Sequence, residues 1–131
     1  MKKNIFSTQI DVRWGDLDAL NHVNNTLYFR YLEETRIRWF ETLKQQVHEQ
    51  SCGPVIVTAS CEFLQMVTYP EKLEIRLHSD PPGRSSVNLH HDIIKTSNNE
   101  IAAKGQCKVV WIDYQAQKSI SLPDVIRNAV S

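Results

Sequence analysis

The sequence contains 131 residues, of which 41% are hydrophobic and 23% charged, and this composition is typical of one globular domain. Its fifteen basic and fifteen acidic residues cancel, which excludes the global positive field that favours nucleic acid or anionic lipid as a partner. The N-terminus has two lysines but no apolar run behind them, so we expect a single cytoplasmic domain over residues 1–131 without a membrane span.

The N-terminal third predicts a strand, a loop and a helix, in that order. Residues 5–14 alternate in polarity, and every second residue up to Trp14 falls on one face, as in a half-buried strand. The next segment is rich in Gly, Asp and Asn and predicts a loop. A long helix should span about 25–43, because no Gly or Pro interrupts it and apolar residues recur at helical spacing. Asn24 is the expected N-cap.

Alternating or apolar segments after the helix predict about four further strands, at residues 55–64, 72–78, 87–93 and 100–113. Pro123 should open a short C-terminal helix. Because the connections between strands are short, we expect antiparallel neighbours. The predicted fold class is therefore α+β, with a long central helix wrapped by a curved antiparallel sheet of about five strands. A chain this small is a natural candidate for pairing into a dimer.

Cysteine and histidine spacing argues against a metal site. The three cysteines include no C-x-x-C pair, and an odd count argues against a disulfide framework. Cys61 and Cys107 lie in apolar-patterned strands, so we expect them to be buried thiols. His90 and His91 are neighbours on one strand and point to opposite faces, which prevents them from binding one ion together. We predict no metal and no cofactor.

The segment WGDLDALNHVNNTLYFRYLEETR, residues 14–36, resembles the signature of the 4-hydroxybenzoyl-CoA thioesterase family in the hotdog superfamily. That signature is a D-x-D pair, a short turn, an H-V-N-N or related step, and a long helix bearing Tyr. The predicted element order is also that of the hotdog fold. The length and the H-V-N-N step look closest to bacterial acyl-CoA thioesterases, which implies a thioester hydrolase acting on an acyl-CoA.

The resemblance implies a role for each motif residue. Asp18, the second acid of the pair, would be the catalytic carboxylate, and Asp16 would be structural. The backbone N–H of Asn25 would polarise the thioester carbonyl. By position rather than by resemblance, His22 could be a ligand, a proton carrier or a loop anchor, and its place beside Asn21 and before the helix favours the anchor. Tyr28 lies one turn into the helix, close to the site, and Asn24 belongs to the same helix start.

Elementary chemistry supports these roles without the family. Thioester hydrolysis develops negative charge on the carbonyl oxygen, and the first amides of a helix are free donors at the positive end of its dipole. A carboxylate in the loop before the helix can activate water as a general base or attack the carbonyl carbon directly. Both routes remain open at this point.

The CoA part of the substrate needs further contacts. In the family, residues at the start of the fourth strand often contact CoA, and Arg84, Ser85 and Ser86 occupy that position here, where Arg can bind phosphate in bidentate fashion. Solvated surface is the alternative reading of these three residues. The family also implies a homodimer with its pocket at the interface, between the helix of one chain and residues 55–58 of the other, and tetramers of paired dimers.

Two other functions occur on the hotdog fold and are alternatives to hydrolysis. A hotdog hydratase or dehydratase uses a catalytic His paired with an acid, and its hydratase variant carries a D-x-N-P-x-H loop. In this sequence Asp18 and His22 are four residues apart, but the Asn-Pro step is missing. A non-catalytic acyl-CoA-binding module often lacks the acid or carries an added DNA-binding segment, whereas Asp18 is present here. Both functions are therefore alternatives to a thioesterase.

Overall fold

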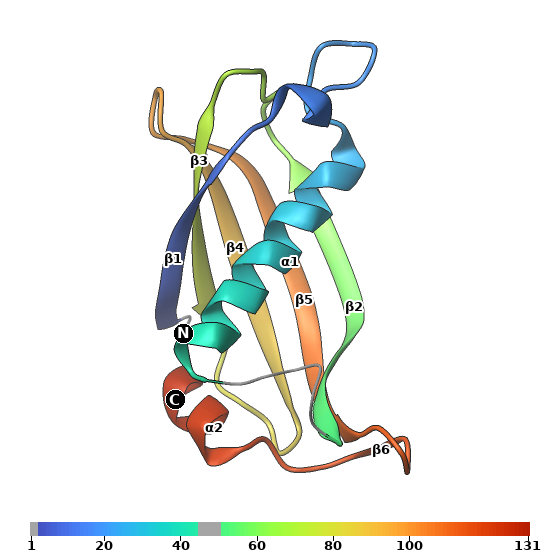
Figure 1. Ribbon diagram of the computed structural model, residues 1–131. Coiled ribbons are helices and arrows are strands. Elements are labelled where there is room, and N and C mark those ends of the chain that lie inside the picture. Colours follow the sequence, from blue (N-terminus) through green and yellow to red (C-terminus); the bar gives the residue numbers. More distant parts are fainter. Residues whose placement is uncertain (1–2, 45–50) are drawn as a thin grey trace.

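The computed structural model describes residues 3–44 and 51–131 and contains an antiparallel sheet with two helices (Figure 1). The elements are β1 (Lys3–Asp11), the short 3₁₀ helix η1 (Trp14–Asp16), α1 (Asn25–Thr42), β2 (Cys52–Phe63), β3 (Lys72–Ser79), β4 (Ser86–Lys95), β5 (Glu100–Asp113), β6 (Lys118–Ser119) and α2 (Asp124–Val130). The strand order is β1-β3-β4-β5-β2, and β6 pairs with β5. The predicted antiparallel α+β architecture is confirmed, with β6 as an additional short strand.

Helix α1 is 18 residues long and lies across one face of the sheet (Figure 1). Its range agrees with the helix predicted for residues 25–43. The helix buries one stripe against the sheet, which consists of Tyr28, Tyr31, Leu32, Thr35, Trp39 and Phe40. In β5, Gly105 faces Leu32, and a Cβ at this glycine would lie 2.4 Å from the Leu32 Cδ1 atom. Glycine therefore allows the helix to approach the sheet closely at this point.

The core divides into two clusters beneath α1. The cluster below the first half of α1 includes Tyr28, Tyr31, Leu73, Ile75 and Ile93. The cluster below its second half includes Trp39, Phe40, Trp111 and Ile126, and helix α2 closes it from the other end of the molecule (Figure 1). The first cluster supports the beginning of α1, where the predicted site lies.

The prediction for Trp14 was wrong. Strand β1 ends at Asp11, and Trp14 begins η1 with 74% of its surface exposed. The chain turns away from the sheet because the Asp16 carboxylate accepts the Arg13 N–H (3.1 Å) while the Asp16 N–H donates to the Arg13 carbonyl (2.9 Å). A local turn therefore overrides the alternating pattern, and the last buried residue of that pattern is Val12.

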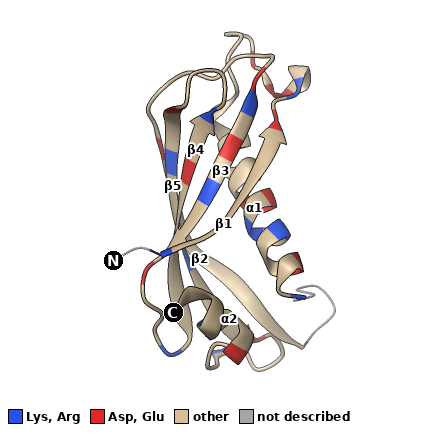
Figure 2. Ribbon diagram, turned by 90° about the vertical axis from the view of Figure 1, so that its left-hand side faces the viewer, with Lys and Arg blue, Asp and Glu red and all other residues tan. Residues whose placement is uncertain are grey.

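The outer face of the sheet, on the side away from α1, carries a row of alternating charges. Arg76, Asp92, Lys104 and Glu62 are direct register partners across β3, β4, β5 and β2. Figure 2 shows acidic and basic bands on these neighbouring strands. Arg76 and Asp92 form their close contacts with neighbouring residues of the same face, Glu74 (2.6 Å) and His78 (3.2 Å), while the row itself places opposite charges on adjacent strands. A shift of one residue in the pairing of two strands would separate these opposite charges and turn the apolar residues of one strand to the outer face. The row of charges therefore helps to define the strand register.

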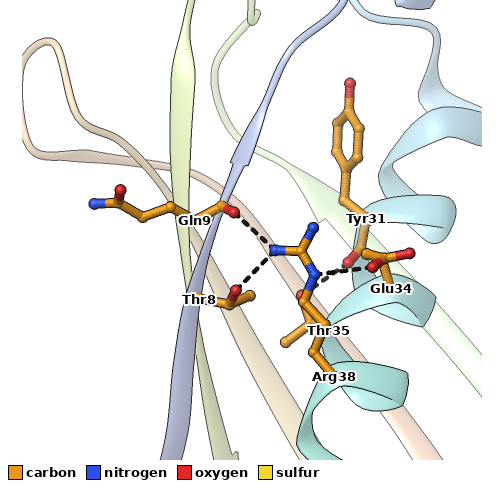
Figure 3. A network of polar contacts seen from close by, with 6 residues as sticks. All are labelled: Thr8, Gln9, Tyr31, Glu34, Thr35 and Arg38. Atoms are coloured by element: carbon orange, nitrogen blue, oxygen red, sulfur yellow. Dashed lines mark hydrogen bonds and ion pairs between the residues drawn. The ribbon is translucent and has the colours of Figure 1, made fainter. Parts of the chain in front are cut away.

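The two edges of the sheet differ in how they are covered. At β1, Arg38 of α1 donates from one guanidinium nitrogen to the Gln9 carbonyl and the Thr8 hydroxyl, both at 2.9 Å, while its Nε binds Glu34 at 2.8 Å (Figure 3). These bonds attach the helix to the β1 edge. Strand β2 forms the other edge and is mostly exposed on both faces, including Val57, next to a bulge in its pairing with β5.

The cysteine prediction holds only in part. Cys107 is buried, but Cys61 is half-buried because α1 covers the β2 edge incompletely. Burial raises the pKa of the Cys61 thiol to about 11, so it stays protonated at neutral pH. Among residues 3–44 and 51–131, His, Cys, Asp and Glu do not gather in threes that could hold a metal ion. Neither helix in this part of the chain is long and apolar enough to cross a membrane.

His91 is fully buried between the sheet and α1, while its neighbour His90 lies on the opposite face, as their adjacent positions predicted. Neither ring nitrogen meets a hydrogen-bond partner among the described residues. Burial, followed by the charge of Arg36 on α1, lowers the pKa of His91 to about 3, while the nearby Gly105 backbone acts in the opposite direction. The side chain is therefore neutral in the folded protein at physiological pH.

We expect His91 to make the fold acid-sensitive. Its folded pKa of about 3 lies below the unfolded value of about 6.5, so between these values only the unfolded chain binds the proton. Stability is therefore lost as the pH falls below 6.5, by about 2 kcal/mol at pH 5. Urea unfolding of wild type and His91→Leu from pH 7.5 to 4.5 isolates this effect, because the carboxylates contribute equally to both curves. Parallel curves would contradict it.

Candidate functional site

The loop between η1 and α1 folds as a small hairpin. Leu17 and Val23 form an antiparallel bridge, and the Asp18 N–H donates to the His22 carbonyl (3.0 Å). The Asn21 N–H donates back to the Asp18 carbonyl (3.0 Å), and Asn21 has a φ of 62°, in the left-handed region that Asn tolerates well. The Asp- and Asn-rich segment therefore forms a hydrogen-bonded loop that places Asp18 beside His22.

The two aspartates of the D-x-D pair have different surroundings. Asp16 is 5% exposed, and its carboxylate accepts hydrogen bonds from the Tyr31 hydroxyl (2.6 Å) and the Arg13 N–H (3.1 Å). Asp18 is half-buried, and its Oδ1 accepts the Leu20 N–H (2.9 Å). Within residues 3–44 and 51–131, no hydrogen-bond donor reaches the second oxygen of Asp18. Asp18 is therefore the member of the pair that has an oxygen available for chemistry.

The beginning of α1 presents a free backbone amide. The Asn24 side chain accepts the Thr26 N–H (2.9 Å), so the predicted N-cap is confirmed. The Asn24 carbonyl accepts the Leu27 N–H (2.9 Å). The N–H of Asn25 has no acceptor among the described residues. Because it lies at the positive end of the helix dipole, this amide can bind a developing oxyanion.

A pocket of about 290 Å³ opens at this end of α1. The described residues that line it come from the loop, from α1 and from the end of β2: His22, Val23, Asn25, Tyr28, Phe63, Leu64, Gln65 and Met66. Most of them are apolar. Asp18 is not among them, but its N–H is bonded to the carbonyl of His22, which lines the pocket. The predicted residues His22, Asn25 and Tyr28 therefore meet at one pocket, and Asp18 is joined to this lining through its backbone bond to His22.

Tyr28 forms the floor between this pocket and the core. It is buried, and its ring packs edge-on against Phe63 (5.0 Å between centroids) and Tyr31 (6.2 Å). Burial raises the pKa of the Tyr28 phenol, with a smaller contribution from nearby Cys61. The phenol therefore stays protonated at neutral pH and can only donate a proton in a hydrogen bond or accept one through its oxygen lone pairs.

Arg84, Ser85 and Ser86 lie at the opposite end of the protomer from Asn25. They precede or begin β4, near the C-terminal end of α1, which is about 27 Å from its beginning at 1.5 Å per residue (Figure 1). The exposed Arg84 guanidinium donates weak hydrogen bonds to Ser119 (3.3 Å) and Ser121 (3.4 Å). A single protomer therefore does not bring these predicted CoA contacts to the pocket.

Two features of the site were not predicted from the sequence. One is the hydrogen bond between Tyr31 and Asp16, which joins residues 15 positions apart. The other is the part of the pocket wall contributed by the segment 63–66 after β2. A local pattern could not reveal either contact. The apolar run of Phe63, Leu64 and Met66 is visible in the sequence, but its exposure, which often marks a binding surface, is visible only in the structure.

Comparison with known proteins supports the motif. The family model described as the thioesterase-like superfamily matches residues 12–130. The chain is 27% identical over 122 residues to the long-chain acyl-CoA thioesterase FadM of Escherichia coli K12, and the match covers 92% of each protein.

Solved structures agree with this assignment. The PA2801 protein of Pseudomonas aeruginosa, described as a candidate thioesterase, has a TM-score of 0.95 and 37% identity, covering 98% of this chain and all of that one. A candidate acyl-CoA thioesterase of Xanthomonas campestris has a TM-score of 0.78 and 31% identity, covering 85% of this chain and 95% of that one. The resemblance found at residues 14–36 is therefore confirmed. The chain has the hotdog thioesterase fold and belongs to the thioesterase-like superfamily.

Proposed function

We propose that this protein hydrolyses an acyl-CoA thioester to the free acid and CoA, with Asp18 as the catalytic carboxylate and the Asn25 amide as the oxyanion donor. The observation behind the proposal is that Asn25, whose backbone N–H has no acceptor among the described residues, lines a mostly apolar pocket, while the backbone of Asp18 is bonded to His22 of the same lining and one Asp18 oxygen has no donor. Similarity to FadM and to the Xanthomonas protein supports an acyl-CoA as the substrate class.

Two chemical routes are compatible with this arrangement. In the first, Asp18 takes a proton from water, the water oxygen attacks the carbonyl carbon, and the carbon–sulfur bond breaks to release CoA thiolate. In the second, an Asp18 oxygen attacks the carbonyl carbon and expels the thiolate, and water then hydrolyses the mixed anhydride. In both routes the negative charge on the carbonyl oxygen develops opposite the Asn25 amide.

Histidine placement favours hydrolysis over hydration. A hotdog hydratase needs a His paired with an acid at the reacting centre. His22 lines the pocket beside Asp18, but its ring forms no hydrogen bond or ion pair with a carboxylate among the described residues. The His–carboxylate pairs in this part of the chain are His78 with Asp92 (3.2 Å) and His90 with Asp80 (2.9 Å). Both pairs lie on the outer face of the sheet, opposite to the face that α1 covers. The binding-only alternative does not use a carboxylate with a free oxygen, whereas hydrolysis does.

The direct test is a panel of acyl-CoAs of increasing chain length, together with aromatic acyl-CoAs, assayed by release of free thiol. The pocket is apolar, so we expect turnover of uncharged acyl groups and little turnover of acyl groups that end in a charge. If no acyl-CoA of the panel releases thiol, hydration of an enoyl-CoA would identify a hydratase. Stable acyl-CoA binding without any reaction would identify a binding module.

We propose a homodimer in which β2 pairs with β2 of a second copy. Strand β2 is a long edge strand with exposed apolar residues, and such an edge favours pairing with another strand. Beside it, a groove of about 340 Å³ between α1 and β2 is lined by Phe29, Leu32, Ile56 and Ala59, among others. At the other edge of the sheet, the Gln9 carbonyl is already bonded to Arg38. These features favour β2 as the edge that the partner covers.

This dimer also gives Arg84 a role. A two-fold axis between antiparallel β2 strands places the end of one protomer that carries Arg84 beside the α1 beginning of its partner. Arg84, Ser85 and Ser86 of one chain would then contact the CoA of a substrate whose thioester lies at Asp18 and Asn25 of the other. The exposed Arg84 guanidinium, which is hydrogen-bonded only weakly to Ser119 and Ser121, suits a phosphate group.

A mixed dimer tests the shared site. Arg84→Gln alone should raise KM for acyl-CoA about 10-fold, because it removes a charge-assisted phosphate contact. A heterodimer of Asp18→Asn and Arg84→Gln chains, isolated with two affinity tags, should recover about half of the wild-type kcat/KM, because one of its two sites is intact. If both residues acted within one chain, the heterodimer would be weaker than the Arg84→Gln homodimer.

The association of dimers into tetramers and the cellular location of the protein stay predictions. The family resemblance implies a homotetramer of two such dimers and a cytoplasmic protein. Light scattering across a dilution series separates dimer from tetramer.

A further inference from the structure

We propose that Tyr31 is a positioning residue that, through Asp16, fixes the active-site loop against α1 and so sets the distance between the Asp18 carboxylate and the Asn25 amide. The inference rests on the proposed function for its catalytic consequence. The hydrogen bond between Tyr31 and Asp16 lies within the described residues, and its role in holding the loop can be tested without an activity assay.

Asp16 connects three parts of the site. Its carboxylate accepts the Tyr31 hydroxyl from the second turn of α1 at 2.6 Å. The same carboxylate accepts the Arg13 N–H at the beginning of the turn, and its other oxygen lies 3.4 Å from the Arg13 guanidinium. The Asp16 backbone carbonyl accepts the N–H of Asn24, the residue that caps α1 (3.0 Å). Asp16 is therefore bonded both to the cap and to the side of the same helix.

Burial makes this connection strong. Asp16 and Tyr31 are 5% and 3% exposed, so water cannot replace the hydrogen bond. A hydrogen bond from a hydroxyl to a carboxylate is short and stronger than one between neutral groups, and 2.6 Å is within that range. Burial and the Asp16 bond raise the pKa of Tyr31 far above its usual value, so the phenol remains a donor at neutral pH.

The position of this contact explains its catalytic consequence. Asp18 follows Asp16 by two residues, and Asn25 directly follows Asn24, which is bonded to Asp16. Each of the two proposed reacting groups is therefore within two residues of a member of this network. The Tyr31 side chain points along α1 toward the helix beginning (Figure 3). Loss of the phenol oxygen would free Asp16 to move relative to α1. A shift of about 1 Å in such a site can cost about 100-fold in rate.

Tyr31→Phe tests the inference, with Thr35→Val as the matched control. Thr35 lies one turn later and is equally buried, and its hydroxyl donates to the Tyr31 carbonyl (2.8 Å), so its loss removes a buried hydroxyl from α1 without touching Asp16 (Figure 3). Hydrogen exchange should become at least about 10-fold faster in residues 14–25 of Tyr31→Phe, but not of Thr35→Val. Asp16→Leu should show the same loop-specific increase, since leucine is similar in size and offers no acceptor to the Tyr31 hydroxyl or the Arg13 N–H.

Kinetics then separate positioning from general stability. With the best substrate of the panel, Tyr31→Phe should lower kcat at least about 10-fold while KM changes less than about 3-fold, because binding is retained and alignment is lost. Thr35→Val should keep its kcat. Unchanged loop exchange in Tyr31→Phe would overturn the inference even if wild type hydrolysed no thioester. Faster exchange with unchanged kcat, or equal kcat losses in both variants, would also overturn it.

Discussion

Asp18→Asn should lower kcat for the best acyl-CoA by at least about 100-fold, the range expected when a positioned general base is removed. The substitution is close to isosteric. The Asn carbonyl oxygen can still accept the Leu20 N–H that Asp18 Oδ1 accepts now, so the loop should keep its shape. What disappears is the charged oxygen that would take a proton from water or attack the thioester. KM should change little, because the lost group acts mainly in the transition state.

Asp11→Asn provides the control for this experiment. Asp11 is an exposed aspartate at the end of β1, with a carboxylate oxygen 3.8 Å from the Lys72 ammonium nitrogen. It takes no part in the proposed site. Its replacement changes the net charge by the same amount and should leave kcat at the wild-type value. Near wild-type turnover by Asp18→Asn would remove this residue from the mechanism. Solvent ¹⁸O recovered in the Asp18 carboxylate after turnover would identify the anhydride route over the general-base route.

Asn25→Pro should lower kcat by about 100-fold or more, which is the usual loss when one oxyanion donor is removed. Proline deletes the backbone N–H without disturbing the fold. Asn25 is the first residue of α1, where proline is well tolerated, and it is exposed. The preceding residue, Asn24, already has φ −60° and ψ 137°, the extended conformation that proline requires before it.

Asn25→Ala separates the amide from the side chain. Alanine keeps the N–H and removes only the carboxamide, so we expect at most about a 3-fold loss of kcat. Circular dichroism and thermal unfolding of both variants show whether α1 is intact. Equal losses in Asn25→Pro and Asn25→Ala would show that the side chain matters and that the amide does not bind the oxyanion.

The local sequence pattern was sufficient for most elements. The Asn24 cap, the helix after it, and the strand over residues 100–113 agree with the structure. Their hydrogen bonds and face patterns depend on residues a few positions apart, so periodicity and capping chemistry record them. The H-V-N-N motif likewise identified the family, because it combines a loop and a helix start within one short segment. Trp14 shows the limit, since the turn at Asp16 ended the alternation before it.

The tertiary structure decided which side chains meet. Tyr31 reads as an ordinary core residue of a helical stripe, and only the folded chain shows its hydroxyl on Asp16. The pocket wall from 63–66 and the location of Arg84 at the far end of the protomer depend on strand order. Strand order is set by how α1 and the sheet bury their apolar faces together. Strand order therefore depends on contacts between residues far apart in the sequence, and residue spacing within one segment does not predict it.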